Sequence, residues 1–276
     1  MKKVVFLLFF ILSSGLYGKN IKIAVSISPI ADIVKEVVEN KGEVITILPA
    51  GASPHFYDPS PQDIIRLNSS DLFIYVGKGV EPWAFKLVNS IEEIKTMELS
   101  SFIQAKNGNF HFWLSPPLME IFVRNLIKIL SKIDTVNSNY YNKNGNKIIY
   151  RLRQLDNEFS NKLSQIKNKN IIIFHNAWFY LAKRYNLKII ATIVQNSNQS
   201  LSPNEIIKIK NLIKRYKINS FFAETTSNIN SVKNISQILG INYLLLDPLG
   251  NRKFPERNGY FNFMRYNLRQ LLKGLK

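Results

Sequence analysis

The sequence contains no cysteine among its 276 residues. This absence excludes disulfide bonds, zinc–thiolate sites and thiol nucleophiles within the sequence. It also argues against the lipid anchor of bacterial lipoproteins, because that anchor is attached to a cysteine at the cleavage site. From the sequence we therefore expect a protein that is not a lipoprotein.

Acidic residues are scarce as well. The chain has 19 Asp and Glu against 37 Lys and Arg, which gives a formal net charge of +18. A nucleic-acid partner is one reading of such an excess, but the basic residues are scattered and form no Arg-rich cluster. The chain is also rich in Asn, Lys and Ile, a bias typical of AT-rich genomes. We therefore expect no nucleic-acid partner, while a weak attraction to anionic membrane surfaces stays open.

Long apolar runs are missing except for a short one at the N-terminus. Lys2 and Lys3 precede an apolar run over residues 4–12, and small residues follow, among them Gly15 and Gly18. This pattern predicts a cleaved signal peptide over residues 1–18. The run is too short to span a bilayer, and no later stretch approaches the roughly 20 apolar residues that a span needs. We expect the mature protein in the periplasm.

Beyond the leader, short apolar runs alternate with amphipathic stretches, which is typical of a parallel α/β architecture. We expect strands at 21–27, 43–48, 72–76, 94–98, 170–174, 188–194, 218–223 and 242–246. Helices are expected at 29–38, from the N-cap Ser60 onward, and at 138–166, 176–185, 202–216, 229–239 and 257–274. Apolar residues recur every three or four positions in 138–166, which predicts a helix of about 40 Å between two halves of the molecule.

The three histidines occupy comparable places. His55 lies in the loop after strand 43–48, His111 precedes a proline-marked helix start, and His175 directly follows strand 170–174. In parallel α/β sheets, ligands gather at the carboxyl ends of the strands. Each histidine stands beside aromatic residues, and taken singly it is more often a packed residue than a ligand. Together they form a candidate metal site.

Two acidic residues also end predicted strands. Asp247 opens a tight turn after strand 242–246, where it is either a fourth ligand or a cap of the turn backbone. Glu224 ends strand 218–223 and has three readings: a ligand, a partner of a metal-bound imidazole, or a helix cap. We favour the second and third readings for Glu224.

Five segments, in order, resemble the periplasmic metal-binding proteins of zinc and manganese ABC uptake systems, the ZnuA/TroA-type solute-binding proteins. The segments are SPHFYDPSPQDI, FHFWLSPP, FHNAWFYLAKRYNL, FFAETTSN and LLDPLG. The resemblance implies an α/β fold with two lobes joined by one long helix and a metal site in the cleft between them. Its ligands are expected to be His55 and His111 from the first lobe and His175 and Asp247 from the second. The implied division is a first lobe over 19–137, a linking helix over 138–167 and a second lobe over 168–276.

The sequence departs from the family pattern around His111. Asn109-Phe110 and Ser115 stand where the family usually has Asp-Pro and Asp. Lost carboxylates could weaken the shell of partners around His111. Many zinc members also carry a long loop rich in His and Asp near this point, and residues 103–110 contain none of it.

Three imidazoles and one carboxylate suit zinc. Manganese prefers more oxygen ligands, and manganese members of the family often have Glu where His175 stands. We therefore expect Zn²⁺ as the transported ion, with Mn²⁺ second. The protein should be a monomer that hands the ion to an ABC permease of the inner membrane, and acid should weaken binding.

Two other classes stay open at this point. A zinc hydrolase also uses three histidines, with a base such as Glu224 and an open position for water. Asp247 as a fourth ligand would close that position, so we expect no enzymatic activity and no catalytic residues. An adhesin or basic surface-binding protein is supported only by the net charge.

Overall fold

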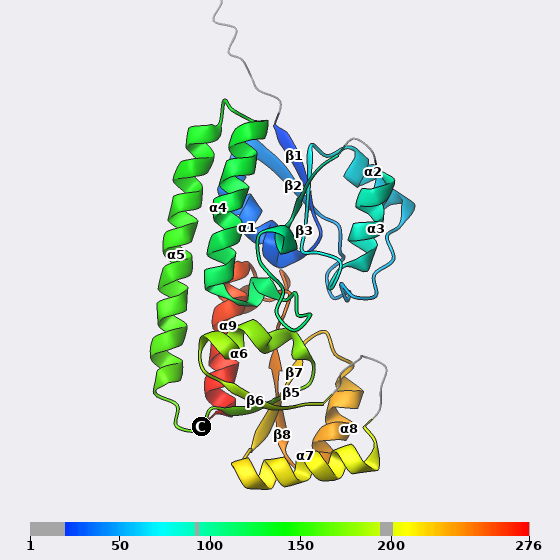
Figure 1. The fold of residues 1–276 in the computed structure, drawn as a ribbon, viewed down its shortest axis with the longest axis vertical. Helices are drawn as coiled ribbons and strands as arrows, with labels where there is room; N and C mark the ends of the chain where they lie inside the picture. Colours follow the sequence, from blue (N-terminus) through cyan, green and yellow to red (C-terminus); the bar gives the residue numbers. More distant parts are fainter. Residues whose placement is uncertain (1–19, 92–93, 194–200, 276) are drawn as a thin grey trace, which may run out of the picture.

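Two parallel β-sheets, each flanked by helices, form the two lobes of the protein (Figure 1). The computed structural model describes residues 20–91, 94–193 and 201–275. The first sheet contains β1 (Ile21–Val25), β2 (Gly42–Thr46), β3 (Leu72–Tyr75) and β4 (Lys95–Glu98), in the order β2-β1-β3-β4. The second contains β5 (Asn170–Ile173), β6 (Lys188–Thr192), β7 (Ser220–Glu224) and β8 (Asn242–Leu246), in the order β6-β5-β7-β8. The predicted two-lobed α/β fold is confirmed.

The short apolar runs of the sequence form strands that lie buried between layers of helices. Every residue of β3 and of β7 is buried. Strands covered by helices on both faces read as continuous apolar runs rather than alternating ones. Apolar side chains of β1 and β3 pack on both sides of the first sheet, as those of β5 and β7 do in the second.

The helices begin where local signals place them. Their bounds are α1 (Ser28–Val38), α2 (Pro61–Asn68), α3 (Pro82–Ser90), α4 (Pro116–Ile133), α5 (Ser138–Ser164), α6 (Phe179–Arg184), α7 (Pro203–Tyr216), α8 (Ile229–Leu239) and α9 (Tyr260–Gly274). The Ser60 side chain accepts a hydrogen bond from the backbone N–H of Asp63, and Ser202 does the same for Glu205. In both cases the acidic side chain bonds back to the serine N–H, which completes a capping box. None of the helices in the described ranges has the length and apolar content that crossing a membrane requires.

The long helix α5 runs along one side of the molecule past both sheets (Figure 1), and it confirms the helix predicted over 138–166. It packs against α4, α1 and α9. Its buried apolar residues belong to one core that reaches from β1 of the first sheet to β5 and α9 of the second lobe. The lobes therefore share packed side chains as well as a connecting helix. The proposed lobe boundaries at 137/138 and 167/168 stay a prediction.

Gly145 allows α5 to approach α4 closely, although glycine costs about 1 kcal/mol relative to alanine within a helix. A β-carbon at this position would overlap the side chain of Ile127 on α4. We expect Gly145→Leu to lower the free energy of unfolding by about 2 kcal/mol, because overpacking outweighs the gain in helix propensity. Denaturant unfolding measures the change, and Asn146→Leu, on the exposed face of α5, is the matched control. Equal stability of the two variants would contradict this account.

Candidate metal centre

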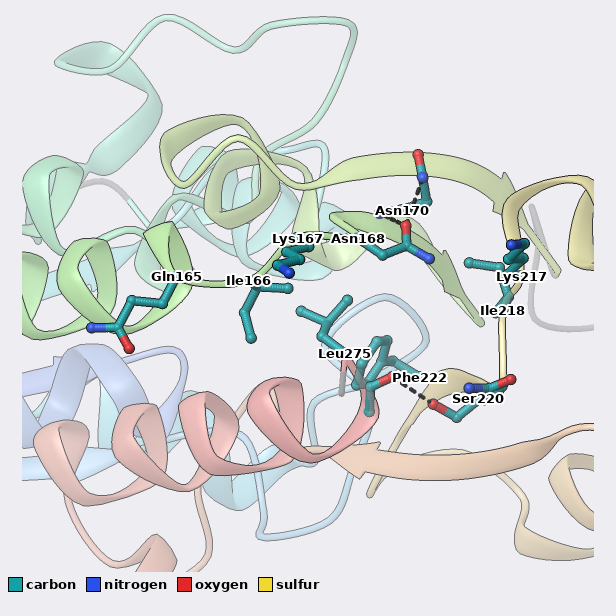
Figure 2. A pocket seen from close by; sticks show the side chains of 12 residues that line it. Gln165, Ile166, Lys167, Asn168, Asn170, Lys217, Ile218, Ser220, Phe222 and Leu275 are labelled. Atoms are coloured by element: carbon teal, nitrogen blue, oxygen red, sulfur yellow. Dashed lines mark hydrogen bonds between the residues drawn. The ribbon is translucent and has the colours of Figure 1, made fainter.

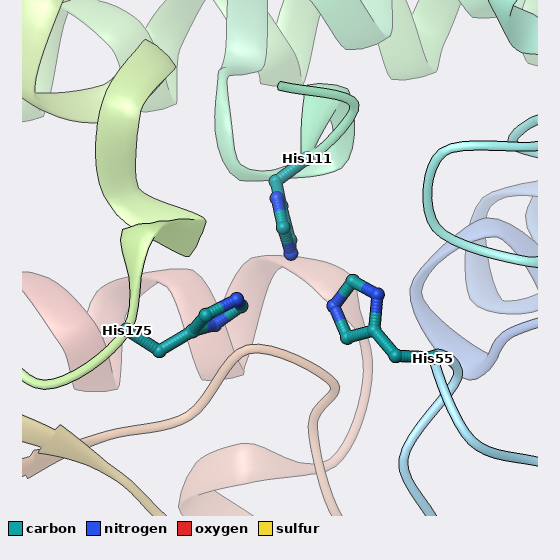
Figure 3. Close-up of side chains that lie close together, drawn as sticks. All are labelled: His55, His111 and His175. Atoms are coloured by element: carbon teal, nitrogen blue, oxygen red, sulfur yellow. The ribbon is translucent and has the colours of Figure 1, made fainter. Parts of the chain in front are cut away.

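The three histidines meet between the lobes, and their rings point toward one another (Figure 3). His55 lies in the loop between β2 and α2, His111 lies just before the short 3-10 turn Phe112–Leu114, and His175 follows β5. One ring nitrogen from each lies within 4.8 Å of the others. Within the described residues, this is the group of His, Asp or Glu side chains whose geometry could hold a metal ion.

Asn109 orients the ring of His111, which is buried. The Asn109 Oδ1 accepts the backbone N–H of His111 at 3.0 Å and lies 3.2 Å from its Nδ1. The Asn109 Nδ2 donates to the carbonyl of Asn176 at 2.5 Å, so Oδ1 is the accepting end of the amide. The Nδ1 of His111 therefore carries the hydrogen, and its Nε2 is left with a free lone pair. His111 thus keeps an oxygen partner, an amide where the family pattern has a carboxylate.

Glu224 orients the ring of His175. The Oε1 of this buried carboxylate, at the end of β7, lies 3.1 Å from the Nδ1 of His175. A carboxylate only accepts hydrogen bonds, so Nδ1 carries the hydrogen and Nε2 is free to bind an ion. Glu224 thus contacts the imidazole of His175, and its role as the partner of a metal-bound imidazole stays a prediction.

His55 is held differently. Within the residues that the structure describes, neither of its ring nitrogens makes a hydrogen bond to the protein. Its loop is fixed on both sides instead. The Trp83 Nε1 donates to the carbonyl of Pro54 at 3.0 Å, and the Tyr57 hydroxyl donates to Asp63 at 2.7 Å.

Burial and mutual repulsion keep two of the three rings neutral. Burial, followed by the charge of His175, lowers the pKa of His55 to about 4. Burial and then the other two histidines lower the pKa of His111 well below its usual value. Burial also disfavours the charged form of His175, but the hydrogen bond and charge of Glu224 outweigh it and raise the pKa of His175. A proton entering the ion-free cluster therefore goes to His175 first.

Asp247 lies directly after β8 but outside the group formed by the three histidines. Its buried Oδ1 accepts the backbone N–H groups of Leu249 at 3.0 Å and Gly250 at 2.8 Å. Its Oδ2 accepts a hydrogen bond from Nη1 of Arg257 at 3.2 Å. The structure thus shows the cap of the turn that the sequence offered as one alternative. The role of Asp247 as a metal ligand stays a prediction.

Hydrogen bonds between the lobes hold the turn that follows Asp247. The Trp113 Nε1 donates to the carbonyl of Pro248 at 2.6 Å, and Ser28 Oγ donates to that of Leu249 at 2.7 Å. Tyr260, from α9, donates to the carbonyl of Trp113 at 2.8 Å. Trp113 stands two residues after His111, so these bonds connect the Asp247 turn to the segment that carries His111.

A cavity of about 370 Å³ lies away from the histidines, where β5 and β7 begin (Figure 2). Its lining residues are Gln165, Ile166, Lys167, Asn168, Asn170, Lys217, Ile218, Asn219, Ser220, Phe222, Gly274 and Leu275. No imidazole or carboxylate side chain is among them, so the cavity lacks the imidazole nitrogens that suit zinc, copper, iron and nickel. The histidine cluster is therefore the candidate centre.

Comparison with known proteins agrees with this geometry. The family model described as "Zinc-uptake complex component A periplasmic", ZnuA, matches residues 23–274. The chain is 29% identical to a metal ABC transporter substrate-binding lipoprotein of Lactococcus lactis, with 93% of this chain and 88% of that protein covered. It is 26% identical to the high-affinity zinc uptake system protein ZnuA of Bacillus subtilis, covering 94% and 88%. It is 27% identical to the manganese ABC transporter substrate-binding lipoprotein PsaA of Streptococcus mitis, covering 94% and 90%.

Solved structures show the same fold. A crystal structure of ZnuA superposes with a TM-score of 0.82 at 24% identity, covering 94% of this chain and 100% of that one. The laminin-binding protein Lmb of Streptococcus agalactiae gives a TM-score of 0.84 at 27% identity, covering 93% and 100%. Lmb is described as a bifunctional protein with adhesin and metal-transporting activity.

The relatives correct the localisation predicted from the sequence. The proteins from Lactococcus lactis and Streptococcus mitis are both named lipoproteins. This finding contradicts the prediction of a periplasmic protein that is not a lipoprotein, and the prediction is wrong. It rested on the missing cysteine, yet these named lipoproteins match more than nine-tenths of this chain. The predicted signal peptide, residues 1–18, lies outside the described residues.

The family model covers nearly the whole chain, and the relatives are named as substrate-binding proteins of metal ABC transporters or as part of a zinc uptake system. Members of such a family bind a solute and pass it to a permease, and they are not enzymes. The chain belongs to the ZnuA family of metal-binding substrate-binding proteins of ABC transporters.

Proposed function

We propose that this protein captures Zn²⁺ through His55, His111 and His175 and delivers it to its membrane permease. One observation carries the proposal: three ring nitrogens, from three separate loops, lie within 4.8 Å of one another. The partners Asn109 and Glu224 support it, because each leaves an Nε2 lone pair for the ion.

The choice of zinc rests on the donors. Imidazole nitrogen suits zinc, whereas manganese takes carboxylate and water oxygens more readily. The relatives include a protein named for zinc and one named for manganese. We therefore infer the metal from the ligand atoms of the site, and titration with both ions tests the inference. Asp247 is proposed as a fourth ligand only for an ion that draws its carboxylate away from Arg257. We further propose that the protein acts as a monomer.

Metal analysis and titration test the function. Protein purified without chelator should contain about one zinc ion per chain, as expected for a single three-histidine site. Chelator-stripped protein should bind Zn²⁺ more tightly than Mn²⁺ in competition with a chelator of known affinity. A zinc content far below one, together with no uptake by the stripped protein, would refute the proposal. Tighter binding of Mn²⁺ would refute only the choice of metal.

A further inference from the structure

A second cavity, of about 350 Å³, is lined by residues from the segments that follow β2, β7 and β8. Gly51, from the loop that carries His55, lines it together with Glu224, the partner of His175. Asp247 and Arg257 line the same cavity. The predicted fourth ligand and a guanidinium group therefore share one space with the carboxylate that contacts His175.

Arg257 contacts the carboxylate oxygen of Asp247 that the turn backbone does not bind. The other oxygen, Oδ1, is already bound by the backbone N–H groups of Leu249 and Gly250. Oδ2 is the atom that could turn toward an ion without breaking the cap of the turn, and it is the atom that Arg257 contacts. The side chains of Asp247 and Arg257 are only 2% and 12% exposed, so water screens the pair little.

A single, long hydrogen bond joins Arg257 to Asp247. The bond measures 3.2 Å, longer than the roughly 2.7–2.9 Å of strong charge-assisted bonds, and is not bidentate. The Arg257 Nε is buried and lacks a hydrogen bond within the described residues. The guanidinium carbon lies 4.0 Å from the ring centroid of Phe254, which holds Arg257 beside Asp247 without using the carboxylate.

We propose that Arg257 is a specificity-determining residue that withholds the Asp247 carboxylate from the bound ion. The inference rests on the proposed function of the three histidines. Zinc binds well to three imidazoles and one water, so it can leave the pair of Asp247 and Arg257 intact. Manganese needs more oxygen ligands, so it must take Asp247 away from Arg257 before the site can hold manganese as tightly as zinc. The ion pair therefore lowers the affinity for manganese more than that for zinc.

Separate titrations of stripped protein with Zn²⁺ and with Mn²⁺ test this role. Arg257→Met removes the guanidinium and keeps an apolar stem against Phe254. We expect it to raise the affinity for Mn²⁺ about tenfold, a common size for coupling between two linked equilibria, and to change that for Zn²⁺ by less than about threefold. In an Arg257→Met background, Asp247→Asn should abolish the gain for manganese. Arg252→Met is the matched control, because Arg252 lies in the same loop, is 58% exposed and pairs with Asp32.

An unchanged ratio of the two affinities in folded Arg257→Met protein would overturn the inference and leave the proposed function standing. Failure of the wild-type protein to bind either ion would instead refute the proposed function. Crystal structures of the wild-type protein loaded with each ion test the same point if Arg257→Met does not fold. Asp247 should stay on Arg257 in the zinc complex and contact the ion in the manganese complex. A zinc complex in which Asp247 has left Arg257 for the ion would overturn the inference.

Discussion

His111→Ala is expected to lower the affinity for zinc roughly two-hundredfold. Structural zinc sites with four ligands contribute roughly 10–16 kcal/mol of binding free energy. One ligand is then worth about 2.5–4 kcal/mol. Each 1.4 kcal/mol is a factor of ten in affinity, so the expected loss lies between about 60-fold and 700-fold. His111 is the histidine for which we expect the full loss, because its ring is buried and Asn109 already holds it in the ligating tautomer.

Competition with a chelator of known zinc affinity measures the change. Gln104→Ala, on the exposed loop that precedes His111, is the control and should bind zinc as the wild-type protein does. Circular dichroism of the ion-free variants establishes that the comparison is made between folded proteins. A loss smaller than about tenfold in folded His111→Ala protein would show that this residue is not a ligand.

Zinc affinity should fall about tenfold for each pH unit below the pKa of His175, and no faster until the solution approaches the pKa of His55. An imidazole must lose its proton before it binds an ion. The pKa of His175 lies above its usual value, so its proton competes with zinc from near neutrality downward. The pKa of His55 is about 4 and that of His111 is well below its usual value, so neither ring takes part in mild acid.

The slope of the logarithm of affinity against pH, between about pH 7 and pH 5, measures the number of protons displaced. We expect a slope of about one. Glu224→Gln provides the control, since without the carboxylate the pKa of His175 should fall and the decline should begin at lower pH. A slope near three in the wild-type protein would mean that the histidines titrate independently, contrary to this account.

Local sequence patterns were enough to predict most of the fold. The apolar runs of β3 and β7 are buried strands, and the serines at 60 and 202 cap α2 and α7 as predicted. These features depend on residues a few positions apart. The helix α3 was not among those expected, although it begins with proline at the first turn. For α4, the prolines after His111 predicted the start of a helix but not its length.

The histidine cluster could be predicted because five ordered segments resemble one family, but the partners of the histidines could not. At Asn109 the sequence indicates only a lost carboxylate, yet the amide oxygen of this residue faces the Nδ1 of His111. That contact depends on the bond from Asn109 to Asn176 in the other lobe, which no local pattern reveals. Asp247 was placed correctly at its strand end, but the direction of its carboxylate is set by Arg257. Spacing along the chain locates a residue and does not determine its rotamer.

The unequal support of the three rings has a kinetic consequence. His111 and His175 are each held by an oxygen partner, whereas His55 makes no such bond within the described residues and stands next to the exposed Phe56. Rotation of His55 away from an ion breaks no hydrogen bond of its ring, whereas rotation of either other histidine does. We therefore expect departure of the ion to begin at His55, so that the rate of release is set by the loop between β2 and α2.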